Sequence, residues 1–187
     1  MAEPYRAEVI GSLLRPGYLM EARAALTAGR MTVAAFKRIE DRAVDEALAM
    51  QAAAGIDAVT DGELRRLAFL GPLMDLGEGV ASLAGETYHW KRSADGSESR
   101  FEFPNPYSVI GRIRRTRSVT VEEYVYARAR SALPIKVTLP SPMLLTMAWS
   151  RKLSAGAYPD PFAMFWDAAA ILRDEVRDLA AAGCEYI

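Results

Sequence analysis

The sequence predicts an α/β fold in which short buried strands alternate with amphipathic helices. Short apolar runs, typical of buried strands, occur at residues 9–14, 56–60, 135–139 and 184–187. The longer segments between them contain stretches with the 3.6-residue period of an amphipathic helix. Connections of this length favour parallel pairing of the strands through right-handed crossovers.

The N-terminal helices have clear start and stop signals. The strand at 9–14 runs into a Gly-Ser turn, after which Pro16 can open a helix that ends near Gly29. Thr32 is a natural N-cap for a second helix, which Gly55 ends. The predicted buried stripe of the second helix is Phe36, Ile39, Ala43, Ala47 and Met50.

The C-terminal half repeats the pattern. Helical segments are predicted around 67–76 and over 121–133, and the strand at 135–139 is closed by Pro140-Ser141-Pro142. Pro161 begins another long helix before the last strand. Its predicted stripe is Phe162, Phe165, Ala169, Leu172, Val176, Leu179 and Gly183.

Residues 86–103 differ in character and predict a β-hairpin excursion. Aromatic and β-branched residues stand on both sides of a polar Asp-Gly turn, which is a hairpin signal. These residues are Thr87, Tyr88 and Trp90 before Asp95-Gly96, and Phe101 and Phe103 after it.

Four βα units in 187 residues correspond to half of a TIM-type (β/α)8 barrel, which usually needs about 250 residues. We therefore expect residues 1–187 to form the N-terminal half of a single barrel domain. The other half would come from a missing chain segment or from another copy in a homo-oligomer, because a half barrel leaves strand edges unpaired. A complete flavodoxin-like sheet is the alternative, since it shares the same local signals.

Composition narrows the class of protein. The net charge of −1 provides no global attraction to nucleic acid or anionic lipid, and no apolar run approaches the roughly 20 residues of a membrane span. The polar N-terminus lacks the apolar core of a signal peptide. A single cysteine, Cys184, rules out an internal disulfide framework and favours a cytoplasmic setting.

The most informative motif follows the second strand. Asp61-Gly62-Glu63 places two carboxylates where a buried strand ends, and functional groups of α/β proteins gather at the C-terminal ends of strands. The glycine permits a sharp turn that brings backbone N–H groups near a ligand. The alternative is an Asx-turn that caps the next helix.

Several segments together resemble the catalytic barrel of the cobalamin-independent methionine synthase family and its stand-alone relatives. They are Ile10-Gly11-Ser12 with Arg15-Pro16, the run Asp61 to Arg66, the run Lys136 to Pro142, and Arg173 to Val176 with Leu179, Ala182-Gly183 and Cys184 to Ile187. They occur in order over nearly the whole chain.

The resemblance implies a TIM-type barrel that transfers a methyl group from methyltetrahydrofolate to the thiol of homocysteine, giving methionine. The backbone of Ile10, Gly11 and Ser12 would hold the amino acid's carboxylate, and Glu63 would accept hydrogen bonds from its ammonium. Alternatively, Ser12 is a turn hydroxyl and Glu63 forms a solvated ion pair with Arg65 or Arg66. Trp149 would stack on the folate's pterin ring, unless it packs in the core. No catalytic residue is assigned.

The resemblance also implies zinc, which holds the thiol as thiolate. The family's ligands are a His-x-Cys pair, an acid and a second Cys, and they would fall beyond Ile187. We predict that neither His89 nor Cys184 binds metal, because they lie in unrelated elements and zinc needs three or four ligands. The 187 residues alone are therefore expected to be inactive.

Two other functions stay open. Relatives use the same zinc–thiolate device on other thiols or donors, such as coenzyme M with an epoxide. Alternatively, the four arginines between Arg112 and Arg117 could bind phosphate or nucleic acid in a non-catalytic module. The simpler interpretation of these arginines is a solvated loop paired with Glu122 and Glu123.

Overall fold

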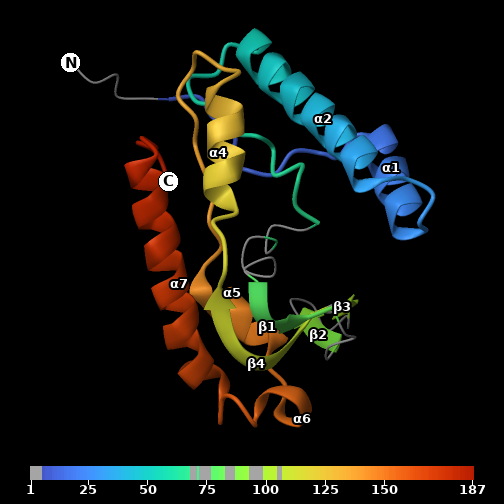
Figure 1. Cartoon of the computed structure of the whole chain (residues 1–187), viewed down its shortest axis with the longest axis vertical. Helices are drawn as coiled ribbons and strands as arrows, with labels where there is room; N and C mark the ends of the chain where they lie inside the picture. The colour runs from blue at the N-terminus through green and yellow to red at the C-terminus, as the bar shows by residue number, and fades with distance from the viewer. Residues whose placement is uncertain (1–5, 68–70, 72–76, 83–86, 93–98, 105–106) are drawn as a thin grey trace. The chain divides into compact units, whose positions relative to one another are not determined.

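The computed structural model describes residues 6–67, 71, 77–82, 87–92, 99–104 and 107–187 of an α/β protein (Figure 1). The described helices are α1 (Gly17–Thr27), α2 (Val33–Ala53), α4 (Thr120–Arg128), α5 (Pro142–Leu145), the 3-10 helix η1 (Thr146–Ala148), α6 (Arg151–Ser154) and α7 (Pro161–Ala181). The described strands are β1 (Gly77–Ala81), β2 (Thr87–Arg92), β3 (Ser99–Pro104) and β4 (Ser108–Arg115).

The described chain divides into two compact units. The first unit comprises Met1–Pro72, Ser118–Leu139 and Glu175–Ile187, and the second comprises Leu73–Arg117 and Pro140–Asp174. No helix among the described residues is both long and apolar enough to cross a membrane.

The first two helices begin where the sequence predicts. Pro16 precedes α1, and the hydroxyl of Thr32 caps α2 by accepting a hydrogen bond from the Ala35 N–H at 3.2 Å. Gly55, with a φ of 74°, lies just beyond the end of α2 in the left-handed conformation that favours glycine. Figure 1 shows α1 and α2, drawn in blue to cyan, packed side by side.

The buried face of α2 differs in part from the predicted stripe. Phe36, Ala43 and Ala47 are buried as predicted, but Met50 is 56% exposed. Gln51 lies inside instead, because its amide bonds to the backbone of the neighbouring segment. Such a polar contact overrides the apolar pattern.

The predicted stripe of α7 is also partly wrong. Leu172 and Leu179 are buried, but Phe162 is 67% exposed and Val176 is 40% exposed. The buried positions of α7 are Met164, Ala168, Ile171, Leu172, Glu175 and Leu179. Glu175 replaces an apolar residue on this face because its carboxylate accepts hydrogen bonds from the backbone and hydroxyl of Thr120, at the start of α4.

The predicted strand segments of the first unit make isolated parallel bridges. Glu8 pairs with Ala58, Val59 with Ile135, and Lys136 with Tyr186. The four chain segments therefore neighbour one another in sequence order, with parallel pairing as predicted. They contribute single bridges and are not assigned as strands.

The first predicted strand, 9–14, is wrong as a strand. Glu8, just before it, makes the bridge, while Ile10 and Leu14 are 94% and 95% exposed. Residues 11–13 turn toward the segment that follows Val59. The Thr60 hydroxyl donates to the Gly11 carbonyl, and the Leu13 N–H donates to the Gly62 carbonyl, both at 3.0 Å.

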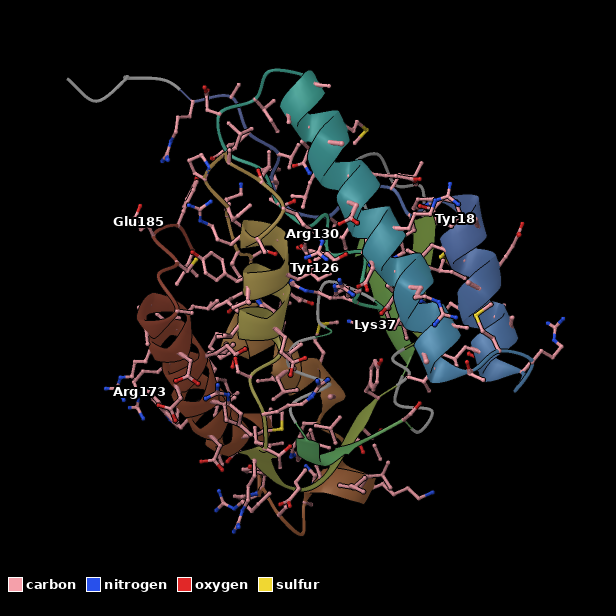
Figure 2. The ribbon with its side chains drawn as sticks, turned by 45° about the horizontal axis from the view of Figure 1, so that its top comes forward. Tyr18, Lys37, Tyr126, Arg130, Arg173 and Glu185 are labelled. Carbon is pink, nitrogen blue, oxygen red and sulfur yellow. The ribbon has the colours of Figure 1, made fainter. Side chains whose placement is uncertain are left out.

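Helix α4 joins α2 through charged and aromatic contacts. The guanidinium groups of Arg65 and Arg130 lie 4.2 and 3.4 Å from the ring centroid of Tyr126. The Tyr126 hydroxyl and Arg130 both reach Asp45 on α2. Figure 2 shows Tyr126 and Arg130 close together at the end of α4. These contacts fix the position of α4, the helix that carries Glu123.

In the second unit, β1 pairs with β4 and β2 with β3, both antiparallel. Tyr158 is fully buried; its hydroxyl accepts from the Ile113 N–H and donates to Asp167. Arg112 pairs with Asp167 at 2.7 Å.

These contacts correct the interpretation of the arginine cluster. Arg112, Arg114 and Arg115 lie on β4 and not in a loop. Arg112 uses Asp167 and not Glu122 or Glu123 as its partner.

Most of the predicted helical segment 67–76 lies outside the described residues.

Candidate functional site

A strained turn holds Glu63 at the end of the second predicted strand segment. Asp61 Oδ1 accepts the Glu63 N–H at 2.9 Å, so the Asx-turn is present. Gly62 has a φ of 69°, and Glu63 itself has a φ of 55°. Non-glycine residues rarely adopt this left-handed conformation, and such strain gathers at functional sites. The turn thus aims the Glu63 side chain inward.

Gln51 fixes the base of this turn from α2. Its side-chain amide donates to the Thr60 carbonyl at 2.7 Å and accepts from the Thr60 N–H at 3.0 Å. Both residues are buried, and the Gln51 amide satisfies the backbone N–H and C=O of Thr60 as a neighbouring strand would. The Thr60 hydroxyl in turn accepts the Gly62 N–H.

The Glu63 carboxylate joins three segments that are far apart in sequence. The Ser12 hydroxyl donates to Glu63 Oε2, and the Thr138 hydroxyl donates to Glu63 Oε1 at 2.6 Å. Glu63 is 4% exposed, whereas Ser12 is exposed. Glu63 is therefore a buried carboxylate whose Oε2 is contacted by the hydroxyl of an exposed residue.

The side chains of Glu63 and Thr138 lie so close to the backbone of residue 11 that glycine is favoured there. A β-carbon at this position would lie 2.7 Å from Glu63 Oε1 and 2.8 Å from the Thr138 Cγ2. A side chain there would force Glu63 or Thr138 to shift, because the Glu63 carboxylate lies against the backbone of residue 11. Among the residues that the structure describes, the N–H groups of Gly11 and Ser12 donate no hydrogen bond.

A buried ion pair lies behind Glu63. Arg66 donates to Glu123 through Nη2 at 2.7 Å and through Nε at 3.1 Å. Burial raises the pKa of Glu123 to about 7, helped by the charge of Asp61 and opposed by Arg66. Although burial alone would lower it, the pKa of Arg66 is raised, chiefly by Glu123.

A second arginine fastens the turn from the N-terminal side. Arg15 Nη2 donates to the carbonyls of Arg66 at 2.9 Å and Glu63 at 3.3 Å. Burial lowers the pKa of Arg15. Lys136 donates to the Val9 carbonyl. These cations act on backbone carbonyls and leave the Glu63 carboxylate to Ser12, Thr138 and Arg66.

The structure brings together three of the predicted site residues: Gly11, Ser12 and Glu63. Ile10 is their neighbour, with its side chain directed into solvent. The ion pair suggested for Glu63 is present with Arg66, whose Nη1 lies 3.6 Å from Glu63 Oε1, but both side chains are buried and the pair is not solvated. Arg65 pairs instead with Asp41 at 2.5 Å.

Trp149 belongs to the second unit. It is half-buried, and its indole N–H donates to the Tyr158 carbonyl at 3.0 Å.

Sequence reasoning missed three residues of this site. Thr138 stands in the quoted third-strand motif, and its alternation with buried Val137 marks it as facing the other side. Arg66 stands in the second-strand motif and forms the ion pair expected with Glu63, but its hydrogen bonds to Thr138 and Glu123 were not predicted. For Glu123 the local sequence gives no signal, because its partner Arg66 is 57 residues away.

The described residues do not fit a zinc site. Among them, no group of three or more His, Cys, Asp or Glu side chains is arranged to hold a metal. Cys184 is buried, its thiol donates to the Tyr186 carbonyl at 3.4 Å, and burial raises its pKa. His89 lies on β2, in a different unit of the chain from Cys184.

Comparison with known proteins identifies the family. The family described as "Cobalamin-independent synthase, Catalytic domain" matches residues 6–187. The chain belongs to this family.

Two curated relatives and one solved structure illustrate the similarity. The chain is 29% identical to the uncharacterized protein YxjH of Bacillus subtilis, over 98% of this chain and 47% of that protein. It is 27% identical to the 5-methyltetrahydropteroyltriglutamate–homocysteine methyltransferase of Streptomyces coelicolor, over 98% of this chain and 22% of that enzyme. A B12-independent methionine synthase from Shewanella sp. W3-18-1, solved with selenomethionine, has a TM-score of 0.71 at 25% identity, covering 96% of this chain and 49% of that chain.

The chain therefore spans about half of the Bacillus and Shewanella proteins and less than a quarter of the Streptomyces enzyme. The predicted family is confirmed.

Proposed function

We propose that this chain binds the amino-acid substrate of a cobalamin-independent methyltransferase between Gly11-Ser12 and Glu63. The complete protein would transfer a methyl group from methyltetrahydrofolate to the thiol of homocysteine, yielding methionine. The observation that carries the proposal is the meeting of Ser12 and Glu63, from two distant segments, beside a glycine whose β-carbon would clash with Glu63.

The charges of this site suit a zwitterionic amino acid. A buried carboxylate with an exposed hydroxyl at its edge can accept an ammonium group, because each new hydrogen bond is charge-assisted. The N–H groups of Gly11 and Ser12, which make no hydrogen bond within the described chain, can donate to a carboxylate. On binding, the Ser12 hydroxyl would yield its place on Glu63 Oε2 to the ammonium.

The fold proposal is the N-terminal half of a TIM-type barrel with a β-hairpin insertion at 86–103. The three parallel bridges, in sequence order, support it. In such a barrel the turn at Asp61-Gly62-Glu63 lies at the C-terminal end of a strand, where substrates bind.

Methyl transfer needs groups besides the amino-acid site, namely a general acid and a means of activating the thiol. The bond between the methyl carbon and the folate nitrogen breaks as the sulfur–carbon bond forms, and the departing nitrogen takes up a proton, so a general acid is needed. Zinc, as the family implies, would keep the thiol deprotonated at neutral pH. Its ligands are proposed to lie beyond Ile187, since no three His, Cys, Asp or Glu side chains are arranged to hold a metal among the described residues.

Trp149 is proposed to stack on the pterin ring of the folate. The hydrogen bond from its indole to the Tyr158 carbonyl fixes the ring in one orientation, and part of its surface stays accessible. Both properties suit a stacking platform.

Equilibrium binding tests the amino-acid site without relying on turnover. Calorimetric titration with L-methionine should show one site, and 4-(methylthio)butanoate, which lacks the ammonium, should bind at least roughly tenfold more weakly because it forms no charge-assisted bond with Glu63. Glu63→Gln should lose this preference. Methionine amide, which lacks the carboxylate, tests the Gly11–Ser12 end in the same way.

A matched variant separates binding from folding. Glu46→Gln alters an exposed glutamate of α2 that pairs with Arg42, and it should keep the preference. Equal affinity for methionine and the deaminated analogue in the unmodified protein would contradict the proposal. Product formation with another thiol, and none with homocysteine, would show that the acceptor is different.

A further inference from the structure

The guanidinium group of Arg66 is held at five points behind Glu63. It is 3% exposed, donates three hydrogen bonds to Glu123, and donates to the hydroxyl and carbonyl of Thr138, both at 3.1 Å. A planar guanidinium with this many partners has one orientation. Arg66 is thus a fixed reference point and not a mobile side chain.

The Thr138 hydroxyl connects this arginine to Glu63. It accepts a hydrogen bond from Arg66 Nη1 at 3.1 Å and donates to Glu63 Oε1 at 2.6 Å. A hydroxyl has a single proton, so the arginine occupies an acceptor position and leaves that proton for Glu63. The orientation of Arg66 therefore sets the direction in which Thr138 donates.

Arg66 forms an ion pair with Glu63 but directs its carboxylate hydrogen bonds to Glu123. Arg66 Nη1 lies 3.6 Å from Glu63 Oε1, too far for a hydrogen bond, while its Nη2 lies 2.7 Å from Glu123. With Glu123 absent, the buried cation would need Glu63 as its counter-charge. Glu63 would then be drawn back from Ser12 and would attract an ammonium less.

We propose that Arg66, anchored by Glu123, is a positioning residue that fixes the Glu63 carboxylate for the substrate's ammonium group. This inference rests on the proposed function, since it assumes that Glu63 receives the ammonium. Neither Arg66 nor Glu123 touches the substrate. Their effect passes through Thr138 and through the charge balance around Glu63.

Affinity for L-methionine and for 4-(methylthio)butanoate measures the effect. Arg66→Lys keeps the charge but cannot reproduce the fork of hydrogen bonds. It should weaken L-methionine binding by roughly tenfold and leave the deaminated analogue nearly unchanged, because only the ammonium depends on Glu63. Glu123→Gln should act in the same direction.

Two further variants separate positioning from stability. Arg66→Met combined with Glu123→Met replaces the buried pair by apolar side chains, a change that buried pairs often tolerate. This double variant should stay folded, as judged by thermal unfolding, and still lose the preference for L-methionine. Arg65→Lys changes the neighbouring arginine, which pairs with Asp41, and should keep that preference.

The outcomes distinguish the two proposals. If Glu63→Gln abolishes the preference for L-methionine and the folded Arg66 variants retain it, the positioning role is wrong and the proposed function stands. If the unmodified protein has no preference, or Glu63→Gln does not change it, the proposed function is wrong and the positioning role fails with it.

Discussion

The carboxylate of Glu63 lies directly against Gly11, where an added β-carbon would come within 2.7 Å of Glu63 Oε1. The two residues belong to segments that meet only in the folded chain. A side chain at position 11 would therefore displace the Glu63 carboxylate or the Thr138 methyl group.

Gly11→Ala should therefore both destabilise the fold and weaken binding. The new methyl group meets Glu63 and the Thr138 methyl at 2.8 Å, and overpacking of this kind costs about 1–3 kcal/mol. Urea unfolding measures the loss, and L-methionine titration measures the displaced carboxylate. Gly17→Ala is the control, because a β-carbon there meets nothing within 4 Å at the start of α1. An unchanged stability of Gly11→Ala would refute the tight packing.

Gln51→Leu should be strongly destabilising although the size of the side chain changes little. It leaves the buried N–H and C=O of Thr60 without partners, at a cost of roughly 2–4 kcal/mol. Chemical denaturation compares it with Thr27→Ala, which removes an exposed side-chain bond to the Arg23 carbonyl and should cost less than about 0.5 kcal/mol. Similar losses in both variants would mean that Gln51 does not support the turn.

The pH dependence of the free energy of unfolding should reveal the titration of the Glu123 carboxyl group. Its pKa rises from 4.5 to about 7 on folding, so the folded protein binds more protons than the unfolded chain between these values. Its contribution to stability is complete below about pH 4.5 and is lost as the pH rises through about 7, with a slope of up to about 1.4 kcal/mol per pH unit.

Glu123→Gln removes this titration. The free energy of unfolding of the unmodified protein, measured in urea at pH 5 and at pH 7.5, should fall more steeply with pH than that of the variant. Parallel pH profiles for the two proteins would show that Glu123 does not titrate abnormally.

Trp149→Phe should weaken binding of methyltetrahydrofolate if the indole stacks on the pterin. An aromatic pair is worth about 0.5–1.5 kcal/mol, and the smaller phenyl ring keeps part of it, so the affinity should fall by at most roughly tenfold. Fluorescence titration of the complete protein measures it. Trp166→Phe is the matched control, since Trp166 is 71% exposed on α7. Equal affinities in the two variants would leave Trp149 as a packing residue.

Local signals explain which parts of this fold the sequence could predict. Pro16 and Thr32 act within one helical turn of the boundaries that they mark, so α1 and α2 begin where expected. The Asp61-Gly62-Glu63 turn was likewise recognisable, because an Asx-turn and a left-handed glycine are properties of adjacent residues. The resemblance added Ser12 as a neighbour of Glu63, and the two residues do meet.

Long-range polar contacts explain what could not be predicted. Gln51 is buried because it pairs with Thr60, and this pairing moves Met50 to the surface. Glu175 is buried on α7 for a similar reason. The pair of Arg66 and Glu123 joins residues from two segments whose proximity only the assembled fold creates. An apolar pattern carries no information about such partners.

A crystal structure of the protein soaked with L-selenomethionine tests the central claim most directly, because the anomalous signal of selenium locates the ligand. We predict the ammonium within hydrogen-bond distance of Glu63 and the carboxylate at the N–H groups of Gly11 and Ser12. Selenium elsewhere, with Ser12 still donating to Glu63 as in the free chain, would contradict the account.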